Sequence, residues 1–186
     1  MSASISLPQL TAAESDHSRR VVERIRDAIE AGSGWISFER FMEMALYEPG
    51  LGYYSAGAEK LGSGGDFVTA PEISPLFSRC VASQCREILE HVSADGILEI
   101  GAGSGVMAAD LLSELAARGC LPERYSILEV SADLRQRQRE TLAARVPQFV
   151  GRVHWLDRLP DEHRGVVIAN EVLDALPVQR FRVRGT

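Results

Sequence analysis

The sequence has few cysteines, and its histidines are not spaced to bind a metal. Its 186 residues include 3 cysteines and 4 histidines, with no CxxC pair and no HxxxH spacing. An odd number of cysteines argues against a disulfide framework and favours reduced thiols in a cytosolic compartment. Because the ligand spacings of metal centres are missing, we expect no metal site.

Long hydrophobic runs and an excess of positive charge are missing as well. No apolar run approaches the ~20 residues that span a membrane. The first residues, MSASISLPQLTAAESDHSRR, match neither a secretory signal nor an arginine-rich transit peptide. A net charge of −6 gives no general attraction to nucleic acid or to anionic lipid. We therefore expect neither nucleic acid nor a membrane as a partner.

The first half of the chain reads as helices around a glycine-rich segment. Apolar residues at helical spacing predict helices over 18–32, 37–46 and 75–91. Residues 47–74 lack periodicity, and a stretch of that length in a compact domain is usually functional or disordered. Its aromatic residues argue against plain disorder.

This pattern predicts three regions along the chain. We expect a flexible arm over 1–17, a region of helices and glycine-rich loop over 18–93, and an α/β domain over 94–186. In the last region, helical patterns over 105–117 and 132–145 alternate with short apolar runs. The strand candidates are 97–100, 125–130, 152–155, 166–169 and 181–183.

Strands that alternate with helices predict right-handed βαβ units and a mostly parallel sheet with flanking helices. The chain stops just after the fifth strand candidate. We therefore expect the sheet to be incomplete at its carboxyl end and the chain to be the first part of a longer protein.

The stretch ILEIGAGSGV (97–106) places three glycines between a strand and a helix. Glycines in that position let the backbone approach a ligand closely. The dinucleotide fingerprint requires a further glycine at position 106, where this chain has Val106, and no lysine follows as a P-loop requires. The turn is therefore less typical of a dinucleotide-binding site or a P-loop than of a site for a different cofactor.

Two further strand ends carry polar residues. Glu129 ends the second strand, where a carboxylate can accept both hydroxyls of a ribose. The stretch VVIANEVLDALPV (166–178) again puts polar residues directly after an apolar strand. Ligands of open α/β sheets bind at such strand ends, so three of them converge on one predicted site.

Together these elements resemble the Rossmann-like S-adenosylmethionine-dependent methyltransferases. In that superfamily, LEIGAGSG is similar to the motif that cradles the cofactor, and Glu129 corresponds to the acid that binds the ribose hydroxyls. The resemblance implies S-adenosylmethionine as cofactor. The predicted cofactor-binding residues are Thr69, Glu99, Gly101, Ala102, Gly103, Gly105, Glu129 and Asn170.

A narrower resemblance covers residues 36 to 181. FMEMALYEPGLGYYS, GDFVTAPEISPLF, LEIGAGSG and ANEVLDALPV, in this order, are similar to the successive signatures of the MidA family. That family has bacterial and mitochondrial members, and the mitochondrial one is a complex I assembly factor that dimethylates an arginine of a complex I subunit. The resemblance implies methylation of an arginine in a partner protein, in the cytoplasm of a bacterium or in the mitochondrial matrix of a eukaryote.

Arginine methylation requires that a poor nucleophile be held in place. A guanidinium stays protonated and its lone pairs are delocalised, so a carboxylate pair that localises its charge can leave one nitrogen free to attack. Glu171 and Asp174 are the predicted catalytic pair, because residues three apart share a face of a helical turn. The alternative for Asp174 is a capping hydrogen bond. Glu99 either holds loop amides or faces the cofactor.

The segment GDFVTAPEIS brings the polar side chains of Asp66, Thr69 and Glu72 together. We expect it to fold over the cofactor, the alternative being ordinary turn chemistry. Two other functions stay open. One is a small-molecule or nucleic-acid methyltransferase, since a cofactor cradle does not identify the substrate. The other is a non-catalytic assembly or chaperone module that keeps the cofactor fold. The sequence does not indicate the oligomeric state.

Overall fold

The computed structural model describes residues 10–56, 68–92 and 96–183. By their internal contacts they divide into two compact units, Gly57–Ala175 and a second that joins Met1–Ala56 to Leu176–Thr186. The two units are not the regions expected from the sequence. The domain boundaries expected at residues 17 and 93 stay predictions.

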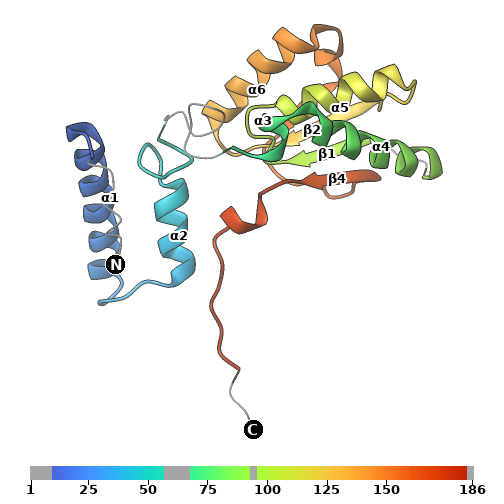
Figure 1. The fold of residues 1–186 in the computed structure, drawn as a ribbon. Helices are drawn as coiled ribbons and strands as arrows, with labels where there is room; N and C mark the ends of the chain where they lie inside the picture. Colours follow the sequence, from blue (N-terminus) through green and yellow to red (C-terminus); the bar gives the residue numbers. More distant parts are fainter. Residues whose placement is uncertain (1–9, 57–67, 93–95, 184–186) are drawn as a thin grey trace, which may run out of the picture. The chain divides into compact units, whose positions relative to one another are not determined.

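Four parallel strands form the sheet of the unit Gly57–Ala175 (Figure 1). The strands are β1 (Gly96–Ile100), β2 (Arg124–Leu128), β3 (Val153–Leu156) and β4 (Gly165–Ala169), and their order is β3-β2-β1-β4. In the central strand, Leu98 lies opposite Ser126 on one side and Val167 on the other. Because all four strands run the same way, their carboxyl ends meet at one edge of the sheet.

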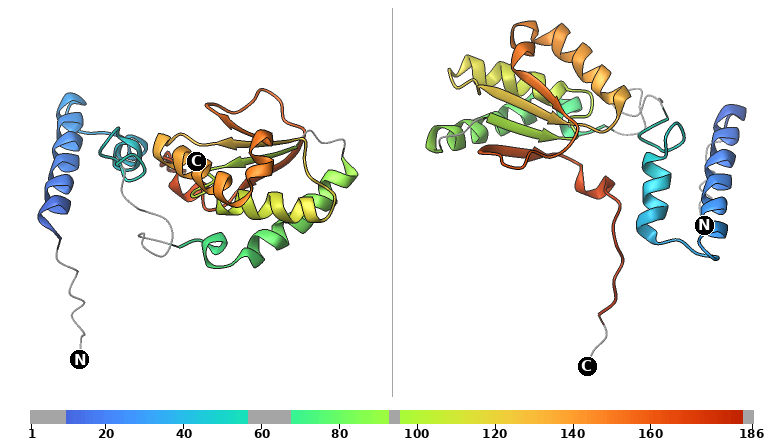
Figure 2. Two further views of the ribbon diagram at one scale, coloured as in Figure 1. Left: turned by 90° about the horizontal axis from the view of Figure 1, so that it is seen from above. Right: turned by 180° about the vertical axis from the view of Figure 1, so that it is seen from behind.

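One face of this sheet carries a layer of helices, as Figures 1 and 2 show. The layer consists of α4 (Pro75–His91), α5 (Val106–Ala117) and α6 (Ala132–Arg145), and α5 contacts both neighbours. The core lies between the two layers, where Ile97 and Tyr125 of the sheet pack in one cluster with Leu111, Leu112 and Leu115 of α5. This burial of apolar surface holds the layers together.

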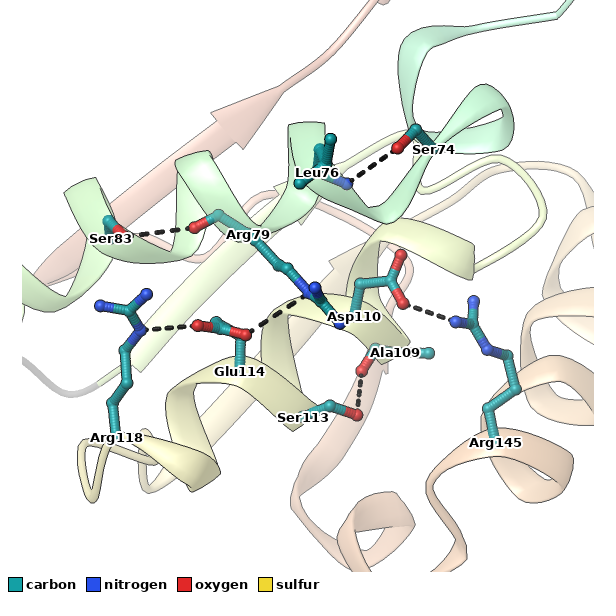
Figure 3. Close-up of polar contacts among 10 residues, drawn as sticks. All are labelled: Ser74, Leu76, Arg79, Ser83, Ala109, Asp110, Ser113, Glu114, Arg118 and Arg145. Atoms are coloured by element: carbon teal, nitrogen blue, oxygen red, sulfur yellow. Dashed lines mark hydrogen bonds and ion pairs between the residues drawn. The ribbon is translucent and has the colours of Figure 1, made fainter.

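Ion pairs connect the three helices across their outer surfaces (Figure 3). The Glu114 carboxylate of α5 pairs with Arg79 of α4 at 3.6 Å and with Arg118 at 2.7 Å. On the other flank, Asp110 of α5 pairs with Arg145 of α6 at 2.5 Å. The Arg79 and Arg118 side chains are largely exposed, so their pairs with Glu114 contribute only about 0–1 kcal/mol each, whereas Asp110 is buried, with 8% of its surface exposed.

The other unit is built on α1 (Ala12–Ala31) and α2 (Phe38–Tyr47). These helices contact one another, and Met44 of α2 is enclosed. The Arg24 guanidinium binds the Glu48 carboxylate at 2.8 Å. The carboxyl-terminal segment joins the same unit through a hydrogen bond from Gln179 to Glu39 at 3.2 Å.

Most expected elements agree with the structure, and three corrections stand out. The first helix begins at Ala12 rather than residue 18, because Thr11 and Glu14 form a capping box. The strand expected over 181–183 is wrong, since no β-ladder forms there and these residues belong to the helical unit. The short helix α3 (Ala70–Ile73) lies within the segment expected to be a loop.

The sequence pattern also did not predict two 3₁₀ helices, η1 (Pro147–Arg152) and η2 (Leu173–Ala175). Within the described ranges, no helix combines the length and apolarity that crossing a membrane requires.

Candidate functional site

The glycine turn after β1 forms the floor of the candidate site. Gly101, Gly103 and Gly105 have φ angles of 66°, 55° and 84°, in the left-handed region that glycine adopts without strain. The Gly101 amide donates to the Leu128 carbonyl at 2.9 Å, which ties the turn to the end of β2. Gly105 is the N-cap residue of α5 and has no side chain to cap it. The Val106 amide donates to the Ser104 hydroxyl at 3.3 Å, and the amides that follow it in the first turn of α5 suit an anionic group of a ligand.

Neighbouring side chains close the space behind this turn. A Cβ atom at Gly101 would come within 2.9 Å of a Val172 methyl carbon, and one at Gly105 within 3.1 Å of the Gln138 Cα. Ala102 is 7% exposed, and its carbonyl accepts from the Gly105 amide at 2.8 Å. Gly101 and Gly105 are therefore required both because a side chain would clash with its neighbours and because their φ angles are positive.

Glu129 follows β2 at the same edge of the sheet and is only 6% exposed. Its Oε1 accepts a hydrogen bond from the Ser131 amide at 2.9 Å, and its Oε2 accepts one from the Gln138 side-chain amide at 3.2 Å. Burial raises the pKa of Glu129, while these hydrogen bonds act to lower it. The Val130 backbone amide also bonds to this carboxylate, and since a carboxylate has about four acceptor positions, it can still accept from a ligand hydroxyl.

Arg135 hydrogen-bonds to the backbone of Glu129. Its Nε donates to the Glu129 carbonyl at 2.6 Å and one terminal nitrogen donates to the Leu156 carbonyl at 2.6 Å. The other terminal nitrogen pairs with Asp157 at 2.8 Å. The ends of β2 and β3 are thereby joined through one side chain. Sequence analysis missed both Arg135, which is half-buried, and Gln138, which is fully buried, because a polar residue in a charged helix gives no sign that it faces inward.

Glu99 lies inside the core beneath the turn, with 1% of its surface exposed. Its Oε2 accepts a hydrogen bond from the Tyr125 hydroxyl at 2.7 Å. Burial raises the pKa of Glu99 to about 7, helped by the charge of Glu129 and opposed by the Tyr125 hydrogen bond. Of the two roles expected for Glu99, neither is tested by this contact.

The residues after β4 form the third part of the candidate site, after the glycine turn and Glu129. Asn170 is half-buried, Glu171 and Asp174 are exposed, and Asp174 lies in the turn η2. Glu171 has a φ of 52°, in the left-handed region that only a few per cent of residues other than glycine adopt. Such a conformation is held by the surrounding structure and is often found at functional sites.

Helix α3 reaches the glycine turn through Glu72, whose carboxylate accepts a hydrogen bond from the Ser104 hydroxyl. Thr69 stands at the N-cap position of α3, half-buried, and its side chain makes no capping hydrogen bond. Asp66, also singled out in the sequence, lies outside the described residues. The described residues 68–74 of this segment are thus connected to the glycine turn through Glu72.

These groups fit a cofactor that carries a ribose and positive charge. The buried Glu129 carboxylate suits a diol, and the amides at the start of α5 suit a carboxylate. Glu72 bonds to the turn directly and Glu129 bonds to it through Gln138. Two carboxylates beside the turn disfavour a polyphosphate by like-charge repulsion and favour a cationic ligand.

Fold and site together define an α/β domain that binds a nucleoside-type cofactor at the carboxyl ends of parallel strands. The chain belongs to a family of S-adenosyl-L-methionine-dependent methyltransferases, whose family model matches residues 80–186. This finding is in line with the glycine turn, the buried acid and the charge of the site.

Among curated proteins, the chain is similar to mitochondrial protein arginine methyltransferases. It is 32% identical over 176 residues to NDUFAF7 of Danio rerio, which covers 81% of this chain and 41% of that relative. It is 29% identical over 194 residues to the NDUFAF7 homologue of Drosophila melanogaster, covering 92% of this chain and 44% of that one. The chain therefore spans less than half the length of these relatives.

Solved structures show the same likeness. A crystal structure of a Burkholderia thailandensis protein bound to S-adenosyl-homocysteine matches with a TM-score of 0.87 at 46% identity, over 92% of this chain and 46% of that one. A native crystal structure from the same organism matches with a TM-score of 0.83 at 45% identity, over 94% and 44% of the two chains. The predicted family, the Rossmann-like fold and S-adenosylmethionine as the family's cofactor are confirmed.

Proposed function

We propose that the protein transfers a methyl group from S-adenosylmethionine to an arginine of a partner protein. The observation that carries the cofactor part is the left-handed glycine turn after β1 beside the buried carboxylate of Glu129 after β2. The arginine part is supported by the relatives, which are named as protein arginine methyltransferases, and by the two exposed carboxylates after β4.

In this proposal each wall of the site binds one part of the cofactor. Glu129 accepts the ribose hydroxyls, and the turn Gly101, Gly103 and Gly105 with Ala102 receives the amino-acid end. Thr69 and Asn170 contribute polar side chains from α3 and from the end of β4. Glu99 supports the turn from within the core. The bound cofactor supplies a methyl group on a positively charged sulfur.

Glu171 and Asp174 bind the substrate guanidinium in this proposal. Two carboxylates hold its charge on two nitrogens, so that the third nitrogen keeps electron density for attack on the methyl group. The left-handed backbone of Glu171 fixes where its carboxylate emerges from the sheet edge. Their exposure leaves both residues accessible to a protein substrate.

The partner is, in the same proposal, a subunit of respiratory complex I. The relatives are named as mitochondrial proteins. We place the activity in the mitochondrial matrix for a eukaryotic form and in the cytoplasm for a bacterial one.

Calorimetric binding of S-adenosyl-homocysteine tests the cofactor part. We expect Glu129→Gln to weaken binding at least tenfold, because a neutral amide offers one acceptor oxygen where the carboxylate offers two. Glu123→Gln serves as the matched control, since Glu123 is an exposed carboxylate one residue before β2. Equal affinity of Glu129→Gln and wild type would remove Glu129 from the site.

Methyl incorporation into proteins, followed by mass spectrometry of the modified residues, tests the arginine part. We expect methylated arginine, and we expect Glu171→Gln and Asp174→Asn to reduce it at least tenfold while S-adenosyl-homocysteine binding is retained. Methylated lysine, or a small molecule as the sole product, would contradict the substrate assignment. Full methylation by both variants would contradict the assignment of the carboxylate pair.

A further inference from the structure

Gln138 occupies the middle of α6 and has no exposed surface. Its side-chain nitrogen donates to the Gly103 carbonyl at 3.0 Å and to the Glu129 Oε2 at 3.2 Å. Its side-chain oxygen accepts from the Trp155 indole nitrogen at 2.9 Å. One amide therefore bonds to the segments that follow β1 and β2 and to a residue within β3.

The chemistry of the partners fixes which way this amide points. An indole N–H can only donate, whereas a carbonyl and a carboxylate oxygen can only accept. The reversed amide would place its oxygen against two acceptors and its nitrogen against a donor. The orientation is thus set by three partners at once, and Gln138 has no alternative arrangement that satisfies them.

The backbone of Gln138 also packs directly on the glycine turn. A Cβ atom at Gly105 would approach the Gln138 Cα to 3.1 Å, so α6 and the turn meet with little space between them. Arg139 lies over the Trp155 ring at 4.8 Å, against the ring that orients the Gln138 amide. Gln138 therefore links the turn to the Glu129 carboxylate through side-chain hydrogen bonds, in addition to the backbone bond from Gly101 to Leu128.

We propose that Gln138 is a positioning residue that sets the Glu129 carboxylate relative to the glycine turn and so couples the ribose and amino-acid parts of the cofactor site. This inference rests on the role proposed for Glu129. Gln138 donates to Oε2 and the Ser131 amide donates to Oε1, and the Val130 backbone amide also bonds to this carboxylate. These bonds fix the direction in which the carboxylate presents its remaining acceptor capacity to the ribose hydroxyls.

Removal of the Gln138 side-chain amide is expected to weaken cofactor binding through its effect on Glu129. In Gln138→Met the side chain keeps a similar length, but the Gly103 carbonyl and the Glu129 carboxylate lose their shared donor. Buried polar groups left without a partner move toward other partners, including water. We expect the carboxylate to lose its fixed position and the affinity for S-adenosyl-homocysteine to fall about tenfold.

A double-mutant cycle on the affinity for S-adenosyl-homocysteine tests the coupling. The four proteins are wild type, Gln138→Met, Glu129→Gln and the double variant. We expect the double variant to bind no more than about twofold more weakly than Glu129→Gln alone. Multiplicative losses would overturn the role of Gln138, while an unchanged affinity of Glu129→Gln alone would instead overturn the role of Glu129.

The pH dependence of binding is a readout that simple loss of packing does not move. The Gln138 hydrogen bond lowers the pKa of Glu129, so without it the carboxylate takes up a proton at higher pH. The titratable neighbours that act on Glu129 or face it are Glu99 in β1 and Arg135 in α6, and both are kept in the variant. As the pH is lowered, we expect Gln138→Met to lose affinity for S-adenosyl-homocysteine at a higher pH than wild type does. Superimposable pH profiles would contradict the proposal.

Trp155→Phe provides a second variant should Gln138→Met fail to fold. It keeps an aromatic ring in β3 and removes the N–H that orients the amide, together with part of the indole ring. We expect its affinity to fall by about threefold, and to be unchanged when Glu129 is already replaced by Gln. A loss of the same size in both backgrounds would overturn the inference.

Discussion

The Tyr125 hydroxyl donates a hydrogen bond to the Glu99 carboxylate across 2.7 Å, and both side chains are enclosed by the core. They come from neighbouring parallel strands, directly beneath the glycine turn. Burial raises the pKa of both groups, and the charge of Glu99 raises that of Tyr125 further. The pair places a titratable carboxyl at the base of the cofactor site, with consequences for stability.

Replacing Glu99 by Gln is expected to make the protein less sensitive to pH. The folded-state pKa of about 7 lies above the ordinary value of 4.5. The folded state therefore binds a proton that the unfolded state releases, and wild type loses stability as pH rises from about 4.5 to 7. Relative to wild type, Glu99→Gln should gain about 2–3 kcal/mol in free energy of unfolding between pH 5 and pH 8.

Urea denaturation of both proteins at the two pH values measures this change. Glu123→Gln is the matched control, since its carboxylate is exposed. A stability difference between Glu99→Gln and wild type that stays constant across this range would contradict a raised pKa for Glu99.

Tyr125→Phe is expected to have the opposite dependence on pH. The hydroxyl stabilises the charged form of Glu99 and so acts to lower its pKa. Without the hydroxyl, the protein should lose about 1–2 kcal/mol, and more at pH 8 than at pH 5, because the unpaired carboxylate is charged at the higher pH. Urea denaturation at the same two pH values measures this loss of stability. A larger loss at pH 5 than at pH 8 would contradict a hydrogen bond from Tyr125 to the charged Glu99.

Gly101→Ala is expected to destabilise the protein more than a second glycine substitution with the same backbone angle. Gly101 and Gly119 have φ angles of 66° and 70°. A Cβ atom at Gly119 meets nothing within 4 Å, whereas one at Gly101 meets Val172 at 2.9 Å. Gly119→Ala should therefore cost about 1 kcal/mol for the backbone alone, and Gly101→Ala should cost roughly 1–2 kcal/mol more through overpacking.

Thermal or urea unfolding of the two variants gives the comparison. Adding Val172→Ala to Gly101→Ala should recover part of the extra loss by removing the methyl group that the new Cβ meets. Equal losses for the two single variants would show that Val172 does not limit the turn.

Glu171→Gly is expected to be more stable than Glu171→Ala by about 1 kcal/mol, because glycine adopts a φ of 52° without the steric cost that alanine pays. Both variants lose the carboxylate, so both should lose arginine methylation equally. The unfolding free energies of the two variants report the backbone strain at position 171, and their yields of methylated arginine report the loss of the carboxylate. Higher stability of the alanine variant would argue against the left-handed conformation.

Several parts of the fold follow from local chemistry that the sequence displays. Apolar spacing gave the second helix and the helix that follows Ser74 to within a residue, whereas the first helix begins six residues earlier than expected because the Thr11 cap was missed. The alternation of strands and helices after Gly96 gave the parallel sheet, and four of the five strand candidates are strands. The fifth, around Phe181, failed because an apolar and basic alternation is a strand only where a neighbouring strand offers its backbone.

The sequence by itself determined that glycines follow one strand and an acid follows the next, because such residues act through backbone geometry and charge that are local to a motif. Only the tertiary structure decided that Gln138, thirty-three positions after Gly105 by residue number, bonds to both of these segments. It also decided that Glu99 is enclosed with Tyr125. Burial and hydrogen-bond partners arise from segments distant in the chain, and no local pattern records which segments pack together.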